Sequence, residues 1–315
     1  TLRVVELSGG VGGAKLAEGL AAHLGSDLTI VVNTGDDLEL HGLAIWPDHD
    51  TVAYTLAGLD DEVRGWGLRN ETWTVMDALA TLGDEPWFRL GDRDLGTHLW
   101  RTDRLRAGAR PTEVALEHRD RLGIAPRILP MADESVRTEV RTEHGWLEFQ
   151  EYFVHRHQEP TVREVRFRGI ESRRATPEVV AVLAAAEAII IAPSNPIVSI
   201  GPILALPGSR DVLAAARRRG VPVIAMSGIV AGKALKGPAD RMLTSLGFES
   251  SALGVARLYR DVADVFVLDA LDKAAIPEIE ALGMRAVAMD TIMSDDAARA
   301  RVGRDVLDLV GTIGG

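Results

Sequence analysis

The segment of residues 8–15, Ser-Gly-Gly-Val-Gly-Gly-Ala-Lys, combines residue types that bind phosphate groups. A mostly apolar stretch, Leu2–Leu7, precedes it, and apolar residues with a helical period follow at Leu16–Leu20. A strand, a glycine-rich turn and a helix in this order direct free backbone N–H groups and the positive end of the helix dipole towards an anion. Glycines also let the backbone approach a phosphate closely and adopt positive φ where needed. We therefore expect a phosphate to be bound by Gly10, Gly12, Gly13 and Lys15.

The glycine run alone does not identify the ligand. It lacks the longer loop, closed by Gly-Lys-Ser/Thr, of a Walker A motif, and it matches the dinucleotide pattern G-x-G-x-x-G only in part. A tight turn without any ligand is the alternative. The next expected strand favours a ligand site, because Leu28–Val32 ends in the polar, acidic segment Asn33–Asp37. Open α/β sheets bind ligands at the carboxyl ends of their strands.

Four aspartates close to this edge are candidate metal ligands or bases. Asp36 and Asp37 follow the second strand, and Asp48 and Asp50 lie in residues 41–51, which we expect to be irregular. If Asp48 to Asp50 are extended, both carboxylates face the same way. A cluster of this kind suits Mg²⁺, which binds through one or two carboxylates and substrate phosphates, and we assign Asp36, Asp37 and Asp48 to the metal. The alternative is that Asp36 or Asp48 only caps a turn or a helix.

Two further loops carry polar side chains suited to ligand contact. Residues 193–196, Pro-Ser-Asn-Pro, follow the apolar strand Ala188–Ala192, and their prolines stiffen a loop in which Ser194 and Asn195 can contact a nucleotide or its phosphates. Residues 88–94, Phe-Arg-Leu-Gly-Asp-Arg-Asp, form either a solvated salt-bridge cluster or a clamp for a polar ligand. Tryptophans near this segment could wall a flat ligand, but we expect most of them to lie in a core.

The order of the expected elements indicates an α/β fold. It predicts a doubly wound, mostly parallel, Rossmann-like sheet of about six strands with an inserted α+β lobe. Strand and helix patterns alternate in residues 1–57 and again in residues 171–315, which form the predicted core. Residues 58–170 break this alternation with three helix candidates and a β-hairpin, whose predicted strands Val136–Thr142 and Trp146–His155 flank Glu143–Gly145. They form the predicted lobe over the active site.

The composition excludes several classes of function. The chain has 315 residues, a net charge of −11 and no cysteine. The acidity argues against nonspecific binding of nucleic acid or anionic membranes, and the lack of cysteine excludes disulfides and thiolate chemistry. No apolar run approaches the roughly 18 residues of a membrane span, and we expect no signal sequence ahead of the first strand pattern. We therefore expect a cytoplasmic protein without nucleic-acid or membrane partners.

Six short motifs follow one another along roughly the first two-thirds of the chain: Ser8-Gly-Gly-x-Gly, Asn33-Thr34, Pro47-Asp48-x-Asp50-Thr51, Leu90-Gly-Asp-Arg-Asp94, Ala192-Pro-Ser-Asn-Pro196 and Ser199-Ile-Gly-Pro-Ile203. Each motif is modest by itself. In this order they resemble the 2-phospho-L-lactate transferase family of coenzyme F-420 biosynthesis, including its bacterial phosphoenolpyruvate-using members.

The resemblance implies a reaction and its partners. The terminal ribityl hydroxyl of the deazaflavin Fo attacks the β-phosphorus of a GDP-activated phospho-acid (lactyl, enolpyruvyl or glyceryl), and GMP leaves. It also implies a requirement for Mg²⁺, a homodimer, and contacts of Asp50 and Arg89 with Fo. Asp50 is then expected to orient or deprotonate the attacking hydroxyl, or instead to bind metal. The glycine loop resembles the bacterial version, which favours an enolpyruvyl donor. Residues 227–238 are a candidate for the guanine side of the nucleotide.

Two rival functions share the glycine-rich opening. The first is a non-catalytic, nucleotide-sugar-binding regulator, as in the related gluconeogenesis-factor proteins. Against it, residues 90–94 and 193–196 resemble the transferases. The second is an NAD(P) oxidoreductase. Against it, the chain pairs no full G-x-G-x-x-G with an acid clearly placed at the end of the second strand, and Asp36 and Asp37 come closest.

Overall fold

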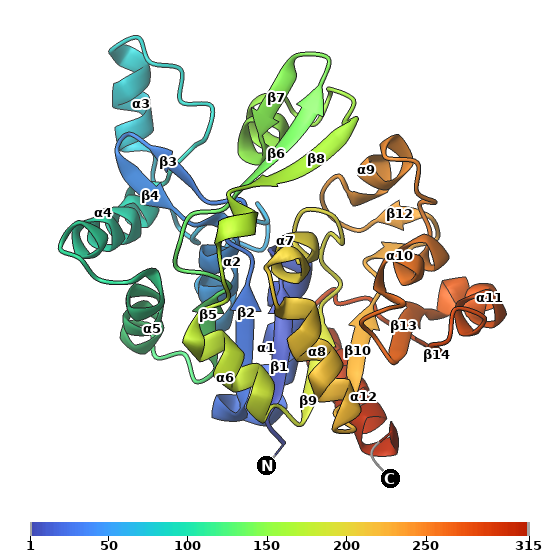
Figure 1. The fold of residues 1–315 in the computed structure, drawn as a ribbon. Helices are drawn as coiled ribbons and strands as arrows, with labels where there is room; N and C mark the ends of the chain where they lie inside the picture. Colours follow the sequence, from blue (N-terminus) through green and yellow to red (C-terminus); the bar gives the residue numbers. More distant parts are fainter. Residues whose placement is uncertain (1, 314–315) are drawn as a thin grey trace.

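The computed structural model describes residues 2–313, and a sheet of seven parallel strands forms its centre (Figure 1). The spatial order of the strands is β14-β13-β10-β9-β1-β2-β5. The chain therefore builds one side of the sheet outward from β1 and then returns to build the other side from β9. The strands are β1 Val4–Ser8, β2 Leu28–Val32, β5 Arg127–Pro130, β9 Ala188–Ile191, β10 Val223–Met226, β13 Val265–Asp269 and β14 Arg285–Met289.

Helices cover both faces of this sheet, which confirms the predicted doubly wound α/β fold. One hydrophobic core joins alternate strand residues to the first group of helices: α1 Val11–Leu24, α2 Pro47–Leu56 and α12 Asp296–Ile313. The other core joins the remaining strand residues to the second group: α6 Pro177–Ala185, α7 Ile200–Ala205, α8 Ser209–Arg218, α10 Ala252–Tyr259 and α11 Ile276–Glu280. No helix among residues 2–313 combines the length and apolarity needed to cross a membrane.

The central strands are apolar because they are covered on both sides. Every residue of β1 and β9 is buried, as the apolar pattern of residues 188–192 predicts. Glu6, in the middle of β1, is an ionisable residue among these apolar ones. It is fully buried, and neither of its carboxylate oxygens has a hydrogen-bond partner. Burial raises the pKa of Glu6 well above its ordinary value, so this side chain favours the neutral form.

Three additions surround the carboxyl ends of the strands, mostly in the upper half of Figure 1, whereas β1 begins and α12 ends at the bottom. The first consists of β3 Leu38–Leu40, β4 Leu43–Ile45, α3 Thr74–Thr81, α4 Asp92–Arg106 and α5 Pro111–Arg121. The second is an antiparallel sheet of β6 Arg137–Thr142, β7 Gly145–Glu148 and β8 Glu164–Arg168. The third consists of β11 Ile229–Val230, β12 Lys233–Ala234 and α9 Ala239–Ser245.

The structure differs from the sequence-based boundaries in three places. Residues 58–170 are not one continuous lobe, because β5 lies within them and pairs with β2 as the seventh strand of the central sheet. Residues 47–56 are helical rather than extended, since Pro47 suits a first helical turn and the acidic side chains that follow favour a helix N-terminus. Residues 151–155, expected to continue the hairpin strand, form a π-helical turn.

Candidate active site at the carboxyl edge of the sheet

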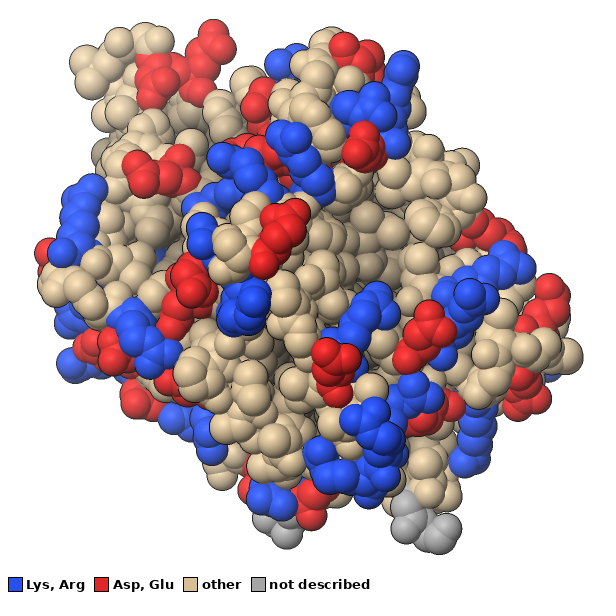
Figure 2. Space-filling model, in the orientation of Figure 1, with Lys and Arg blue, Asp and Glu red and all other residues tan. Residues whose placement is uncertain are grey.

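A cavity of about 740 Å³ opens at the carboxyl edge of the central sheet. Loops that follow five of the seven strands line it, and they contribute Gly10, Asp36, Ser194, Ser227 and Thr291. The sheet reverses its winding between β1 and β9, and ligands of open α/β sheets bind outside such a point. On the face drawn in Figure 2, mostly uncharged surface lies between the β6–β8 sheet and α9, with both charge signs interspersed around it. The volume suits a ligand of nucleotide size.

The glycine loop forms one wall of this cavity and is shaped by close packing. The N-terminus of α1 has no side-chain cap, so its first N–H groups are available to a ligand. None of the loop glycines has positive φ. Instead, a Cβ on Gly12 would meet the carbonyl oxygen of Pro193, and a Cβ on Gly13 would meet Ser8 Oγ. Glycine is therefore needed here for the approach of the β1 and β9 loops to each other.

Ser194 and Asn195 lie beside the glycine loop and line the cavity, but part of their polar chemistry is already engaged. Ser194 Oγ accepts a hydrogen bond from the N–H of Gly9 at 3.0 Å. Asn195 Oδ1 accepts from the N–H groups of Ile197 at 2.9 Å and Val198 at 3.2 Å. These bonds tie the 193–198 loop to the start of the glycine loop and keep it stiff. The Asn195 side chain therefore mainly stabilises its own turn.

Lys15 lies in the first turns of α1 and lines the same cavity. Partial burial lowers the pKa of its ammonium group, and the positive charges of Arg299 and Lys236 lower it further. A lysine in this environment gains from an anion, because a bound negative charge removes the repulsion between neighbouring cations.

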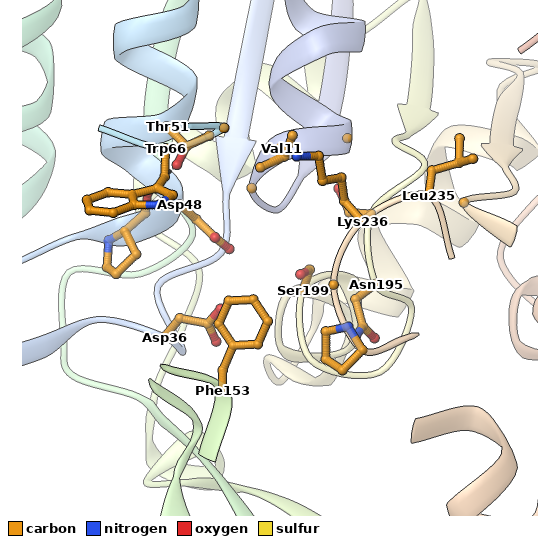
Figure 3. Close-up of a pocket in the computed structure, with 18 of the residues that line it drawn as sticks. Val11, Asp36, Asp48, Thr51, Trp66, Phe153, Asn195, Ser199, Leu235 and Lys236 are labelled. Carbon is orange, nitrogen blue, oxygen red and sulfur yellow. Dashed lines mark hydrogen bonds between the residues drawn. The ribbon is translucent and has the colours of Figure 1, made fainter. Parts of the chain in front are cut away.

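Asp36 and Asp48 form an acidic pair in the cavity: Asp48 lies against the glycine loop, since a Cβ on Gly10 would be 2.9 Å from Asp48 Oδ1, and Asp36 lies near Phe153 of the β6–β8 addition (Figure 3). Asn33 Nδ2 donates to Asp48 Oδ2 at 3.0 Å, whereas Asp36 Oδ1 is buried without a hydrogen-bond partner. Burial raises the pKa of Asp48 to about 6. Burial and the nearby charges of Asp48 and Asp37 raise that of Asp36 well above its usual range. Two buried carboxylates with a free oxygen fit a hard divalent cation such as Mg²⁺.

Three predicted site residues do not line the cavity: Gly13, Asp37 and Asp50. Gly13 packs against Ser8 and Ser194 behind the glycine loop. Asp37 turns away from Asp36 and lines a separate cavity of about 220 Å³. The structure therefore brings Asp36 and Asp48 together in the cavity and places Asp37 and Asp50 outside its lining.

Asp50 lies on the side of α2 opposite to Asp48, because residues two apart on a helix point about 200° from each other. Its carboxylate contacts both terminal nitrogens of Arg101, whose side chain is 0% exposed, and the Nη1 bond measures 3.1 Å. His98 Nδ1 lies 3.7 Å from Asp50, and His98 Nε2 lies 3.2 Å from Asp94. Asp50, Asp94 and His98 are close enough to ligate one ion, but the guanidinium group already neutralises Asp50. In this structure Asp50 anchors α2 to α4.

Aromatic side chains from the additions form a third wall, which sequence reasoning could not resolve residue by residue. Trp66, Trp87, Phe88, Phe149 and Phe153 line the cavity. Two of these rings are held by stacking, since Phe153 lies 5.5 Å from Phe149 with an interplanar angle of 9°. A wall of this kind offers contact area to a flat ring.

Arg89 lines the cavity beside this wall, and its neighbours in the 88–94 segment have structural roles. Its guanidinium group lies 3.3 Å from Asp77 and 5.0 Å from the ring centroid of Trp73, and both the arginine and the aspartate are exposed. Asp92 instead accepts hydrogen bonds from the Thr72 hydroxyl and from the first turn of α3, and these lower the pKa of its carboxyl to about 2. Within this segment, Asp92 therefore caps α3, and Arg89 contributes to the lining of the cavity.

Two further contributors follow β10 and β14. Ser227 and Gly228 come from the loop after β10, at the start of residues 227–238, the candidate for the guanine side of the nucleotide. Residues 291–294 were missed, although their position directly after the last strand was a usable signal. Asp269 fixes this second loop, since its carboxylate accepts from the N–H of Thr291 at 3.0 Å and from its hydroxyl at 2.9 Å.

The family model and the relatives found by sequence point to one family. A family model described as 2-phospho-L-lactate transferase CofD matches residues 4–307. A phosphoenolpyruvate transferase of Streptomyces griseus is 42% identical and covers 98% of each chain. A 2-phospho-L-lactate transferase of Methanosarcina mazei is 39% identical over 92% of this chain and 95% of its own. A crystal structure of a UPF0052 family member from Bacillus halodurans has a TM-score of 0.66 at 14% identity, covering 98% of this chain and 99% of that one, and shows the shared fold.

Proposed function

Because the chain belongs to the 2-phospho-L-lactate transferase family, a family of phospho-acid transferases in coenzyme F-420 biosynthesis, we propose the following reaction. The protein transfers a 2-phospholactyl, phosphoenolpyruvyl or 3-phosphoglyceryl group from its GDP-activated donor to the ribityl hydroxyl of the deazaflavin Fo, and GMP is released. The observation that carries this proposal is one cavity with three chemically distinct walls: a cationic glycine loop, an acidic pair and an aromatic surface.

The glycine loop and Lys15 are the proposed donor side. The uncapped N-terminus of α1 presents backbone N–H groups, and Lys15 adds a full positive charge beside them. Phosphoryl transfer from a diphosphate depends mainly on positioning and on neutralising charge. These groups supply both to the nucleotide that leaves.

Asp36 and Asp48 are the residues that would hold Mg²⁺. The unpartnered Asp36 oxygen and the mutual repulsion of the two carboxylates support this assignment. Asn33 orients Asp48 through its hydrogen bond. When bound, Mg²⁺ supplies neutralisation of the phosphate oxygens as charge builds on them.

The aromatic wall is the proposed acceptor side. A deazaflavin ring is flat and apolar on its faces, so it gains contact area against Trp66 or Trp87, with Arg89 available to its polar groups. In the transfer, the acceptor oxygen forms a bond to the β-phosphorus, and the bond from that phosphorus to the bridging oxygen of GMP breaks. The hydroxyl proton passes to a carboxylate of the cavity or to water. The assignment of Asp50 as the base stays a prediction. Its carboxylate is bound by Arg101 and does not line the cavity, which favours a structural role instead.

One assay tests the reaction directly. The purified protein is incubated with Fo, Mg²⁺ and each of the three guanylylated acids in turn, and the products are identified by mass spectrometry. We expect GMP and a phosphodiester of Fo in equal amounts with at least one donor, and neither product when Fo is omitted. If no donor yields GMP, the transferase proposal fails. A non-catalytic regulator would bind the nucleotide without turnover.

The same assay also identifies which acid the donor carries. Relatives named for phosphoenolpyruvate and for 2-phospho-L-lactate are similar to this chain at 42% and 39% identity. We propose the enolpyruvyl donor, because the glycine loop, Val11 to Lys15, resembles the bacterial version. A clear preference for the lactyl donor would contradict this part alone.

A further inference from the structure

Lys236 reaches into the cavity from the loop between β12 and α9. In Figure 3 its side chain and that of Val11, the first residue of α1, point towards each other. Its positive charge is one of those that lower the pKa of Lys15, so the two ammonium groups share one region of the cavity. Lys236 also spans the mouth, because a Cβ on Gly65 of the opposite loop would lie 2.8 Å from its Nζ.

The local structure aims Lys236 at this region and provides no anion for it. β12 ends just before the loop, and the buried Pro238 directly precedes α9, so the loop is fixed at both ends. Lys233, three residues earlier, faces Asp240 at 4.0 Å, whereas Lys236 has no acidic partner within that distance in the described residues 2–313. Two lysines and an uncapped helix N-terminus therefore converge here, and the negative charges of Glu62 and Asp60 act on Lys15 less strongly than the positive charges of Arg299 and Lys236.

We propose that Lys236 is a second phosphate-binding lysine, which together with Lys15 binds the diphosphate of the nucleotide donor against the N-terminus of α1. The inference rests on the proposed function for the identity of its ligand. Its chemistry is that of any diphosphate, since two separate cations match the charge of two phosphate groups better than one does. It assigns a phosphate contact to a loop whose sequence alone indicated only the base side of the nucleotide.

The test measures binding of GDP by calorimetry, in Mg²⁺, for the wild type and for Lys236→Met, Lys236→Arg and Lys233→Met. Lys233→Met is the matched control, because it removes the same charge three residues away, in β12, from a side chain that does not line the cavity. We expect Lys236→Met to weaken GDP binding roughly 10- to 100-fold, the loss of one charge-assisted contact. Lys236→Arg should stay close to the wild type, and Lys233→Met should match it. Thermal melts confirm that each variant is folded.

The salt dependence gives a second readout. Affinity for GDP should fall less steeply with added salt in Lys236→Met than in the wild type, because one screened charge has been removed. Equal affinities for Lys236→Met and the wild type, or an equal loss in Lys236→Met and Lys233→Met, would overturn the inference. So would a wild-type protein that binds no GDP. A protein that binds GDP through Lys236 but releases no GMP from any donor would refute the proposed reaction and leave the inference standing.

Discussion

The buried pair of Arg101 and Asp50 provides a quantitative test of whether Asp50 is a scaffold residue. Arg101 is 0% exposed, contacts both oxygens of Asp50, and lies 4.3 Å from the ring centroid of Trp46. Arg101→Met keeps most of the side-chain volume but leaves the Asp50 carboxylate buried and uncompensated. Removing one partner of such a pair costs about 3–5 kcal/mol of unfolding free energy.

The assay is urea unfolding at pH 7.5, followed by tryptophan fluorescence, for Arg101→Met, Asp50→Asn and the double variant. Each single variant should lose about 3–5 kcal/mol, and the double variant should lose clearly less than their sum, because it leaves no unpaired charge. Arg104→Met is the control on the same helix: Arg104 also lies over a tryptophan and pairs with Glu117 at 3.0 Å, but this pair is about one-third exposed. We expect Arg104→Met to cost at most about 1 kcal/mol.

The outcome separates two roles of Asp50. A loss in Arg101→Met as small as that in Arg104→Met would refute the buried-pair reasoning. If the pair is confirmed, turnover of the double variant is informative. A scaffold role predicts that turnover recovers together with stability, whereas a catalytic role predicts that turnover stays lost while GDP still binds.

Three further predictions follow from the cavity and the central strand. Gly12→Ala should lower the unfolding free energy by about 1–3 kcal/mol and weaken GDP binding, because the methyl group meets the Pro193 carbonyl. Gly96→Ala, in an open part of α4, is the control and should raise the unfolding free energy by about 0.5–1 kcal/mol; thermal melts measure stability and calorimetry measures GDP binding. Because burial raises the pKa of Glu6, the wild type should lose unfolding free energy as the pH rises above the pKa of Glu6 in the unfolded chain, near 4.5, and Glu6→Gln should remove this loss. Urea unfolding at pH 8 checks this, and a Glu6→Gln variant no more stable than the wild type would contradict the prediction. Mg²⁺ should raise the Tm of the wild type but not of Asp48→Asn, and an equal rise in both would exclude Asp48 as a ligand.

The sequence predicted those parts of the fold that depend on local pattern. The apolar runs of β1 and β9 and the glycine turn after β1 could be identified because each is a short segment with its own signal. β5 could not, since a four-residue strand followed by loop residues resembles many coil segments until its pairing with β2 is known. The helix at 47–56 was missed although Pro47 and its acidic neighbours are a usual start signal.

The site was predictable to the extent that strand ends define it. Gly10, Lys15, Asp36, Asp48 and Ser194 all line the cavity, because the carboxyl ends of parallel strands meet at one edge. Which aromatic residues line it depends on how the additions pack over that edge. Among the tryptophans, two line the cavity, whereas Trp73 and Trp100 pack against smaller cores of the additions. Spacing along the chain does not contain this information.

The placement of Asp48 and Asp50 on opposite sides of α2 changes how a mutation at Asp50 must be interpreted. Asp48 faces the cavity and Asp50 binds α4 through Arg101, so α2 connects the acidic wall to the first addition. A change at Asp50 that releases α2 would also displace Asp48, and turnover would fall without any proton transfer at Asp50. The two causes differ in their response to metal: a displaced Asp48 raises the Mg²⁺ concentration needed for half-maximal activity, whereas loss of a base lowers kcat at saturating Mg²⁺. Measuring Mg²⁺ titrations of Asp50→Asn beside those of Arg101→Met therefore identifies the role, because only a positioning defect is shared by both variants.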